Sequence, residues 1–308
     1  MKILVTGGAG FIGSHLVDRL IAEGNSVVVV DNLSTGKKES LNSKAVFYNT
    51  DICDDEISNI FQKEKPELVF HLAAQISVRK SVSDPIKDAK INILGSLNIL
   101  ENSRKYNIKK TIFASTGGVM YGNASIIPTP ETYTAQPLCP YGICKLSVEH
   151  YLNYYKNIFN LKYIALRFGN VYGPRQDKNG EAGVVAIFCG KMLNNQDCVI
   201  NGDGLQTRDY IYIKDVIKGL TIAAESDQTG IYNIGTGIET DVNNIYSTLK
   251  TILKVDGKAI HGTAKSGDHR RGSIDASRAQ NELKWRFQYD INKGLIETAN
   301  WFKENNNE

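Results

Sequence analysis

The sequence contains no apolar run near the roughly 20 residues that a membrane-spanning helix requires, which argues against an integral membrane protein. It also lacks an excess of one charge, because 36 lysine and arginine residues stand against 33 aspartate and glutamate residues, for a formal net charge of +3. Nucleic acid is therefore not expected as a partner. Gly7 and Gly8 interrupt the first apolar segment, which favours a strand over a signal peptide. We expect a cytoplasmic protein that binds no membrane.

Cysteine and proline are both scarce, with five and seven residues in the whole chain. The cysteines form no C-x-x-C pair, their number is odd, and no two histidines have the spacing of metal ligands. We therefore expect reduced thiols that pack as small apolar side chains, and no metal site. Hydrophobic residues make up 42% of the chain and charged residues 22%, which excludes disorder and collagen-like repeats.

Short β-branched runs alternate with longer helical patterns through the first half of the chain. Val27 to Val30 is apolar at every position, as expected for a parallel strand with both faces covered. This alternation predicts a protein of the α/β class with a doubly wound parallel sheet of the Rossmann type. The expected strands cover residues 2–6, 26–31, 45–49, 68–72, 111–114 and 163–167, and the expected helices include residues 13–22, 85–105 and 140–157.

The alternation weakens after about Gly173, where loop-like segments at 176–183 and 201–207 precede a late apolar segment at 230–234. We therefore expect a first domain over residues 1–172 and a smaller second domain over residues 173–308. Residues from roughly 210 to 237 are expected to return to the first domain, so that the two domains interleave.

A glycine-rich turn follows the first expected strand. Gly7, Gly10 and Gly13 fit the pattern G-x-x-G-x-x-G between an apolar strand and an amphipathic helix. Such a turn lets the backbone approach a pyrophosphate, and the helix N-terminus offers N–H groups and a positive dipole end. Asp31 ends the next strand, where a carboxylate accepts hydrogen bonds from the ribose hydroxyls of NAD and repels the extra phosphate of NADP. These residues predict bound NAD, with Asp51 placed to meet the adenine.

Tyr141 and Lys145 lie four residues apart, so their side chains share one face of the expected helix. A tyrosine has an ordinary pKa of about 10. A neighbouring ammonium, helped by a cationic nicotinamide, is expected to lower that pKa toward the neutral range. Thr116 follows the strand at 111–114 and so lies at the carboxyl edge of the sheet, where ligands bind in this architecture. We interpret these residues as a catalytic group in which Thr116 holds a substrate oxygen in line with Tyr141. On spacing alone, a surface pair and a loop-capping threonine remain the alternative.

Further motifs accompany these residues along nearly the whole chain. They are TGGAGFIGSHL at 6–16, DNLSTG at 31–36, HLAAQ at 71–75, STGGVMYG at 115–122, YGICK at 141–145, LRFGNVYGPRQ at 166–176, RDYIYIKDV at 208–216 and GD at 267–268. As a set they resemble the extended short-chain dehydrogenases/reductases, and among these the UDP-glucose (UDP-galactose) 4-epimerases. The resemblance implies inversion at C4 of a UDP-hexose through a 4-keto sugar, with NAD bound. It also implies a homodimer with a four-helix interface.

Carried over one residue at a time, the resemblance implies three groups of functional side chains. The catalytic residues would be Thr116, Tyr141 and Lys145. NAD would be contacted by Gly7, Gly10, Phe11, Ile12, Asp31, Asn32, Asp51, Ile52, Ala73, Asn92, Tyr141, Lys145 and Phe168. The UDP-sugar would be contacted by Thr116, Tyr141, Asn170, Arg208, Lys265, Asp268 and Gly272. Residues 1–172 would thus bind the dinucleotide and residues 173–308 the UDP-sugar. At Lys265 the chain departs from an arginine found in most relatives, which keeps the charge and loses the planar fork.

Two other functions remain open at this point. A nucleotide-sugar 4,6-dehydratase begins with the same oxidation, but its relatives place Asp and Glu directly after the catalytic threonine, where this chain has Gly117 and Gly118. The second is a non-catalytic NAD-binding regulatory protein on the same fold. Such relatives often lose the tyrosine or the lysine that this chain retains. Epimerisation is therefore the preferred interpretation.

Gly272 is the fourth residue after Asp268, at a position where relatives restricted to plain hexoses tend to carry a bulky tyrosine. The resemblance implies that this position borders the C2 substituent of the sugar. With no side chain there, an N-acetyl group should fit without overpacking. We therefore expect activity on the N-acetylated UDP-hexoses besides UDP-glucose and UDP-galactose. A glycine that only relieves a turn is the alternative.

Overall fold

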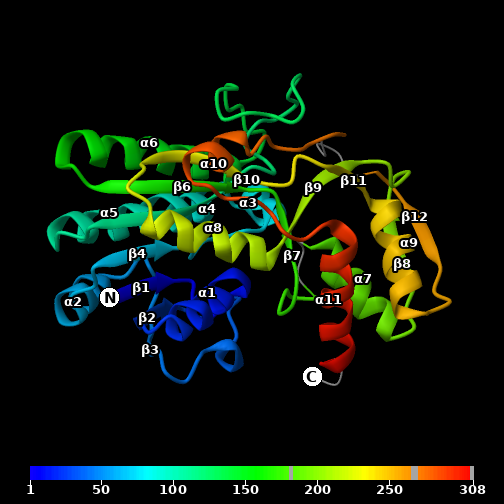
Figure 1. The fold of residues 1–308 in the computed structure, drawn as a ribbon, viewed down its shortest axis with the longest axis horizontal. Helices are drawn as coiled ribbons and strands as arrows, with labels where there is room; N and C mark the ends of the chain where they lie inside the picture. The colour runs from blue at the N-terminus through cyan, green and yellow to red at the C-terminus, as the bar shows by residue number, and fades with distance from the viewer. Residues whose placement is uncertain (180–182, 265–269, 306–308) are drawn as a thin grey trace.

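The computed structural model describes residues 1–179, 183–264 and 270–305. Its largest feature is a sheet of seven strands in which every neighbouring pair runs parallel (Figure 1). The chain order reverses between β1 and β4, and ligands bind at such a reversal in open α/β sheets. From edge to edge the strands are β10 (Gly230–Ile234), β6 (Lys162–Phe168), β5 (Lys110–Thr116), β4 (Leu68–His71), β1 (Lys2–Thr6), β2 (Ser26–Asp31) and β3 (Val46–Asn49).

Helices cover both faces of this sheet because its strands are apolar on both sides. Leu4 and Val28 pack into one layer of side chains, whereas Ile3, Val5 and Val29 pack into the other. Since successive strand residues point to opposite faces, a continuous apolar run is buried on both sides. Figure 1 shows α5 (Ser96–Lys105) and α6 (Pro140–Phe159) on one face, and α1 (Phe11–Ala22) and α8 (Ile213–Glu225) on the other. The doubly wound α/β fold expected from the sequence is confirmed.

The segment 85–105 is not the single α-helix that its periodicity predicts. It begins as α4 (Pro85–Ala89), continues as a π-helical turn, η2 (Lys90–Gly95), and ends as α5. The side chain of Asn92 is held at this turn by two hydrogen bonds to the backbone of Gln75, 17 residues away in the chain. Such turns are frequently found at functional sites. Two further helices precede α4 in the chain, α2 (Glu56–Glu64) and α3 (Val78–Ser83). A short 3-10 turn, η1, covers Lys38–Ser40.

A smaller part lies at one end of the large sheet (Figure 1). It contains a three-stranded sheet of β7 (Asn170–Tyr172), β9 (Thr207–Tyr212) and β11 (Glu239–Asp241), and a parallel pair of β8 (Cys198–Asn201) and β12 (Ala259–Gly262). Its helices are α7 (Val184–Leu193), α9 (Val242–Leu253) and α11 (Ile291–Glu304), and α10 (Ser277–Glu282) packs near β10. The chain leaves this smaller part after β9, forms α8 and β10, and returns at β11. β10 pairs with β6 at the edge of the large sheet.

The helices and the cysteines can both be compared with what the sequence predicts. Over the ranges that the structure describes, no helix combines the length and the apolar character needed to cross a bilayer. All five cysteines are free thiols, and four of them are buried. The thiols therefore pack as apolar side chains, as their spacing predicts.

Candidate active site

The turn between β1 and α1 requires glycine at several positions. Gly7 has a φ of +73°, and a Cβ atom there would lie 2.7 Å from the backbone nitrogen of Ala73, in the loop after β4. A Cβ atom on Gly13 would lie 2.0 Å from the carbonyl oxygen of Gly7. Helix α1 begins at Phe11, and its N-cap residue, Gly10, has no side chain with which to cap it. The first-turn N–H groups therefore remain available to an anion.

Three polar side chains extend this turn toward β2 and β3. Asp31 is buried at the end of β2, and its Oδ2 accepts a hydrogen bond of 3.0 Å from the N–H of Ala9 in the glycine turn. The Asn32 amide donates to Oδ2 of Asp51 at 2.7 Å. Burial raises the pKa of Asp51, but hydrogen bonds from the Cys53 backbone and the Asn32 amide outweigh burial, so its pKa lies below the ordinary value. The structure thus brings Asp31, Asn32 and Asp51 to one edge.

A chain of hydrogen bonds joins this turn to the π-helical turn through His71. Oγ1 of Thr6 accepts from the two backbone N–H groups that follow His71, so its own proton points to Nδ1 of His71 at 2.7 Å. Nε2 of His71 then donates to Oγ of Ser96 at 2.8 Å, and Ser96 donates to the carbonyl of Asn92 at 2.7 Å. Burial, with a smaller effect of the Lys145 charge, lowers the pKa of His71 to about 3. His71 is therefore a neutral structural link.

Asn92 and Ile52 lie beside the same turn. The amide of Asn92 contacts the backbone of Gln75 through both of its polar atoms and also donates to Asp88 at 2.9 Å. A Cβ atom on Gly95 would lie 2.7 Å from Cδ1 of Ile52, so the helix passes close to the loop after β3. Sequence analysis gave both residues through the resemblance alone, because nothing in the local pattern marks a π-turn.

Lys145 connects α6 to the end of β5. Pro140 is the first residue of α6, a position where a missing N–H is tolerated. Tyr141 and Lys145 follow within the first two turns of this helix. The Lys145 ammonium donates to the carbonyl of Ala114 at 2.8 Å and lies 5.8 Å from the centre of the Tyr141 ring. Thr116 ends β5 two residues beyond Ala114. The side chain of Lys145 is 3% exposed, and burial lowers its pKa to about 8.

Without bound NAD, the pKa of Tyr141 lies above its ordinary value. Burial raises the pKa of Tyr141, and the nearby Cys139 and Asp88 raise it further. The Lys145 ammonium donates to the Ala114 carbonyl, and burial outweighs the effect of its charge on the pKa of Tyr141. Ionisation of Tyr141 near neutral pH therefore requires positive charge beyond that of Lys145.

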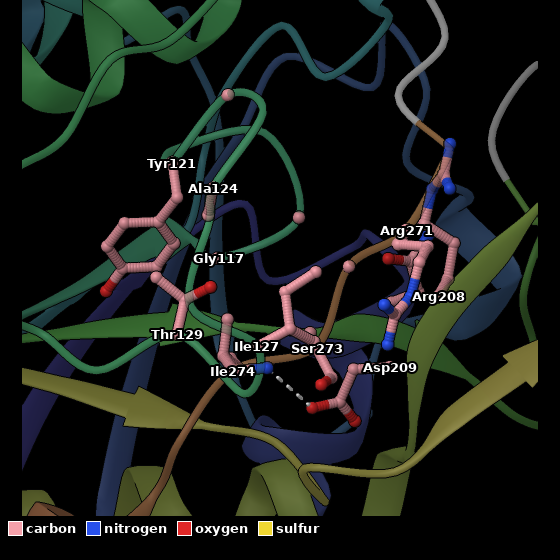
Figure 2. Close-up of a pocket in the computed structure, with 15 residues that line it drawn as sticks. Gly117, Tyr121, Ala124, Ile127, Thr129, Arg208, Asp209, Arg271, Ser273 and Ile274 are labelled. Atoms are coloured by element: carbon pink, nitrogen blue, oxygen red, sulfur yellow. Dashed lines mark hydrogen bonds between the residues drawn. The ribbon is translucent and has the colours of Figure 1, made fainter. Parts of the chain in front are cut away.

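A pocket opens beside Gly117 and Gly118, directly after Thr116. Figure 2 shows Arg208 and Arg271 on one side of this pocket and Tyr121 on the other. Asn170, Arg208 and Gly272, which sequence analysis assigned to substrate, line it, whereas Lys265 and Asp268 lie outside the described residues. Sequence analysis did not anticipate the rest of the lining, which includes Tyr121, Thr129, Asp209, Ser273 and Ile274.

Asp209 joins the pocket lining at Ile274 to the loop after β10. Its side chain is buried, and it accepts hydrogen bonds from the backbone N–H and the hydroxyl of Thr236, from the N–H of Gly237 and from the N–H of Ile274. Figure 2 shows the bond to Ile274. The only signal in the sequence is its place next to Arg208 in RDYIYIKDV, and no spacing rule links it to residue 274, 65 positions away.

Comparison with known protein families decides how this arrangement is classified. The model of the NAD dependent epimerase/dehydratase family matches residues 3–235, which is most of the chain. The chain belongs to this family.

Solved structures are similar over the full length of the chain. A UDP-glucose 4-epimerase of Thermotoga maritima, solved with UDP-glucose, is 49% identical with a TM-score of 0.98, over 99% of both chains. A UDP-glucose 4-epimerase of Thermus thermophilus, in complex with NAD, is 39% identical with a TM-score of 0.94, over 98% of this chain and 99% of the other. A UDP-N-acetylglucosamine 4-epimerase of Methanobrevibacter ruminantium, in complex with UDP-N-acetylmuramic acid, is 36% identical with a TM-score of 0.94, over 99% and 98%.

Proposed function

We propose that this chain is an NAD-dependent 4-epimerase that interconverts UDP-glucose and UDP-galactose. The observation that carries the proposal is the placement of Lys145, Tyr141 and Thr116 around the end of β5, next to a pocket that contains Arg208. A guanidinium suits a pyrophosphate because it can donate two parallel hydrogen bonds. The similar structures solved with UDP-glucose and with NAD support the same function.

The residues of the glycine turn fit a bound NAD. A side chain at Gly7 or Gly13 would meet backbone atoms at less than 3 Å, so glycine at these positions allows the tight turn and the close packing of α1 against it. The first turn of α1 would hold the pyrophosphate, and Asp31 would accept hydrogen bonds from the adenosine ribose. Asn92, Tyr141, Lys145 and Phe168 would border the nicotinamide half. When bound, NAD supplies a hydride acceptor for C4 of the sugar and a positive charge.

The side chains of the chain itself move the proton. The Tyr141 oxygen takes the proton of the sugar's 4-hydroxyl as C4 is oxidised, and returns it when C4 is reduced. Lys145 stabilises the negative charge on that oxygen, and Thr116 orients the 4-oxygen of the sugar. The pocket lined by Gly117, Gly118 and Gly272 would give the 4-keto sugar room to present its opposite face before the proton returns. Atoms and charge balance over one turnover.

The glycines after Thr116 argue against dehydration. A Cβ atom on Gly117 would lie 2.7 Å from Cδ1 of Ile274 and 3.1 Å from the carbonyl oxygen of Phe168. A Cβ atom on Gly118 would lie 3.2 Å from Oδ1 of Asn170. The acid and base that elimination from C5 and C6 needs therefore have no place at these two positions.

One incubation distinguishes the candidate functions. The purified protein is incubated with UDP-galactose and, separately, with UDP-glucose, and the sugars are separated and identified. Interconversion of the two hexoses supports the proposal. A 4-keto-6-deoxy product would identify a dehydratase, and unchanged sugars with NAD still bound would identify a non-catalytic protein.

The proposal includes a homodimer. Helices α4, η2 and α6 pack together and leave large apolar side chains in solvent, among them Ile86 at 82% exposure and Leu94 at 59%. The same surface continues over Ile143, Tyr151 and Tyr154 of α6. Monomeric proteins rarely expose apolar patches of this kind, so a second copy of the chain is the occupant that fits the expected four-helix interface. The cytoplasmic location expected from the sequence stays a prediction.

A further inference from the structure

Ser273 is a buried pocket residue whose hydroxyl forms no hydrogen bond to the residues that the structure describes. It lies between Gly272 and Ile274 in the segment that walls the pocket (Figure 2). Its side chain is 3% exposed, and among the described residues no donor or acceptor lies within hydrogen-bond distance of its Oγ. Native proteins rarely leave a buried hydroxyl unpaired, because the group has given up its bonds to water. An exception in the lining of a pocket therefore points to a partner on the ligand.

The nearest carboxylate of the pocket lining cannot serve as that partner. A carboxylate has about four acceptor positions on its two oxygens. In Asp209, Oδ1 accepts from the N–H and the hydroxyl of Thr236, and Oδ2 accepts from the N–H groups of Gly237 and Ile274. Asp209 is thus fully occupied by the residues that it holds in place.

The backbone of Ser273 is fixed on both sides, so its side chain cannot turn away with the chain. The carbonyl oxygen of Ser273 accepts from the N–H of Thr129 at 2.9 Å, and the N–H of Asp275 donates to the carbonyl of Thr129 at 2.9 Å. The N–H of Ile274 is bound to Asp209 at 3.2 Å. These bonds form a short parallel bridge between residues 129 and 274. Ser273 is therefore held in the pocket lining by its backbone.

We propose that the Ser273 hydroxyl binds a polar group of the sugar ring of the substrate, next to the space that Gly272 leaves open. This inference rests on the proposed function and names a specificity-determining contact in the same site. A serine hydroxyl donates one hydrogen bond and accepts others. It can therefore donate to a carbonyl or ring oxygen, or accept from a sugar hydroxyl, in either orientation that the 4-keto sugar adopts.

The Ser273→Ala variant tests this contact. Because it removes a hydroxyl that has no protein partner, the midpoint of thermal unfolding should stay the same or rise. The KM for UDP-glucose should rise about tenfold, as expected for the loss of one hydrogen bond to the sugar, with kcat little changed. By calorimetry, the affinity for UDP-glucose should fall by the same factor, whereas the affinity for UDP, which has no sugar, should not change.

Thr111→Val is the matched control. Thr111 lies in β5, is fully buried, and has the same kind of unpaired hydroxyl, but it is not part of the pocket lining. Its replacement should likewise leave the unfolding midpoint unchanged or raised, and it should leave the KM for UDP-glucose unchanged. Both variants remove a buried, unpaired hydroxyl, but only Ser273 belongs to the pocket lining.

Three outcomes would overturn the inference. An unchanged KM and an unchanged affinity for UDP-glucose in Ser273→Ala would mean that the hydroxyl does not bind the sugar. A lower unfolding midpoint, with equal losses of affinity for UDP and UDP-glucose, would mean a structural role. Absence of UDP-glucose binding by the native protein would remove the ligand altogether. If the native protein binds UDP-glucose without converting it, the proposed function fails while the affinities still decide the role of Ser273.

Discussion

Tyr141 is the proposed proton-transfer residue, and burial, with smaller effects of Cys139 and Asp88, raises the pKa of its hydroxyl. Tyr141→Phe removes only that oxygen, so we expect the fold and the bound NAD to be retained. Turnover should fall by about 10²–10⁴-fold, as is typical when a proton-transfer group is lost. The measurements are kcat with UDP-galactose and the dinucleotide released when the protein is denatured.

Tyr232→Phe is the control for that variant. Tyr232 is also buried, and its hydroxyl donates to Glu282 at 2.6 Å on β10, outside the pocket lining. It should cost some stability and leave kcat unchanged. Near-normal turnover in Tyr141→Phe, or an equal loss in both variants, would contradict the role given to Tyr141.

A substitution at Gly272 tests whether this position controls the choice between plain and N-acetylated UDP-hexoses. The Gly272→Tyr variant places a ring in the pocket, where it should overlap an N-acetyl group on C2 of the sugar. We expect kcat/KM for the N-acetylated pair of UDP-hexoses to fall at least tenfold more than for UDP-glucose and UDP-galactose, a discrimination typical of a steric clash in a pocket. A native protein that ignores the acetylated pair, or a variant that treats both pairs alike, would place the selectivity elsewhere.

At the scale of elements, His71 makes the contact between β1, β4 and the π-helical turn sensitive to acid. The folded protein binds a proton on His71 only near pH 3, whereas an unfolded histidine binds one near pH 6.5. Between these values the unfolded state holds more protons, so stability falls as the pH falls. This contribution is at most about 1.4 kcal/mol per pH unit. Urea unfolding at pH 7, 5.5 and 4 measures it.

His71→Gln provides the comparison for this pH dependence. The amide can still hydrogen-bond to Thr6 or Ser96, but it does not titrate in this range. We expect the variant to be less stable at pH 7 and to lose less stability on acidification than the native protein. Equal slopes in the two proteins would show that other groups carry the pH dependence.

Patterns local in the sequence predict elements well, and contacts distant in the sequence limit that prediction. The strand expected at 2–6 is β1 to the residue, since an apolar run followed by glycine leaves few alternatives. The segment 85–105 has continuous helical periodicity, and its π-turn arises where Asn92 binds Gln75 from another part of the chain. Tyr141 shows the same limit within the site: spacing placed it beside Lys145, but its pKa depends on burial, which spacing does not reveal.

At the scale of the whole molecule, the exposed apolar face of α4, η2 and α6 predicts a dimer. Leu94→Glu places a charge in the centre of that face and should shift the sedimentation of the protein toward the monomer at micromolar concentration. Ile260→Glu is the control, since Ile260 is 49% exposed on β12, away from those helices. It should leave the mass unchanged. A native protein with a monomeric mass at that concentration would count against the dimer.

The position of β10 decides how this protein can be divided. β10 pairs with β6 over five residues, and its Asn233 also donates to the carbonyl oxygens of Thr129 and Asp275 beside the pocket. A chain that ended at residue 172 would lose β10 and bare the edge of β6, and an unpaired edge strand invites pairing with other chains. Residues 1–172 are therefore not a module to be excised or grafted without residues 230–234.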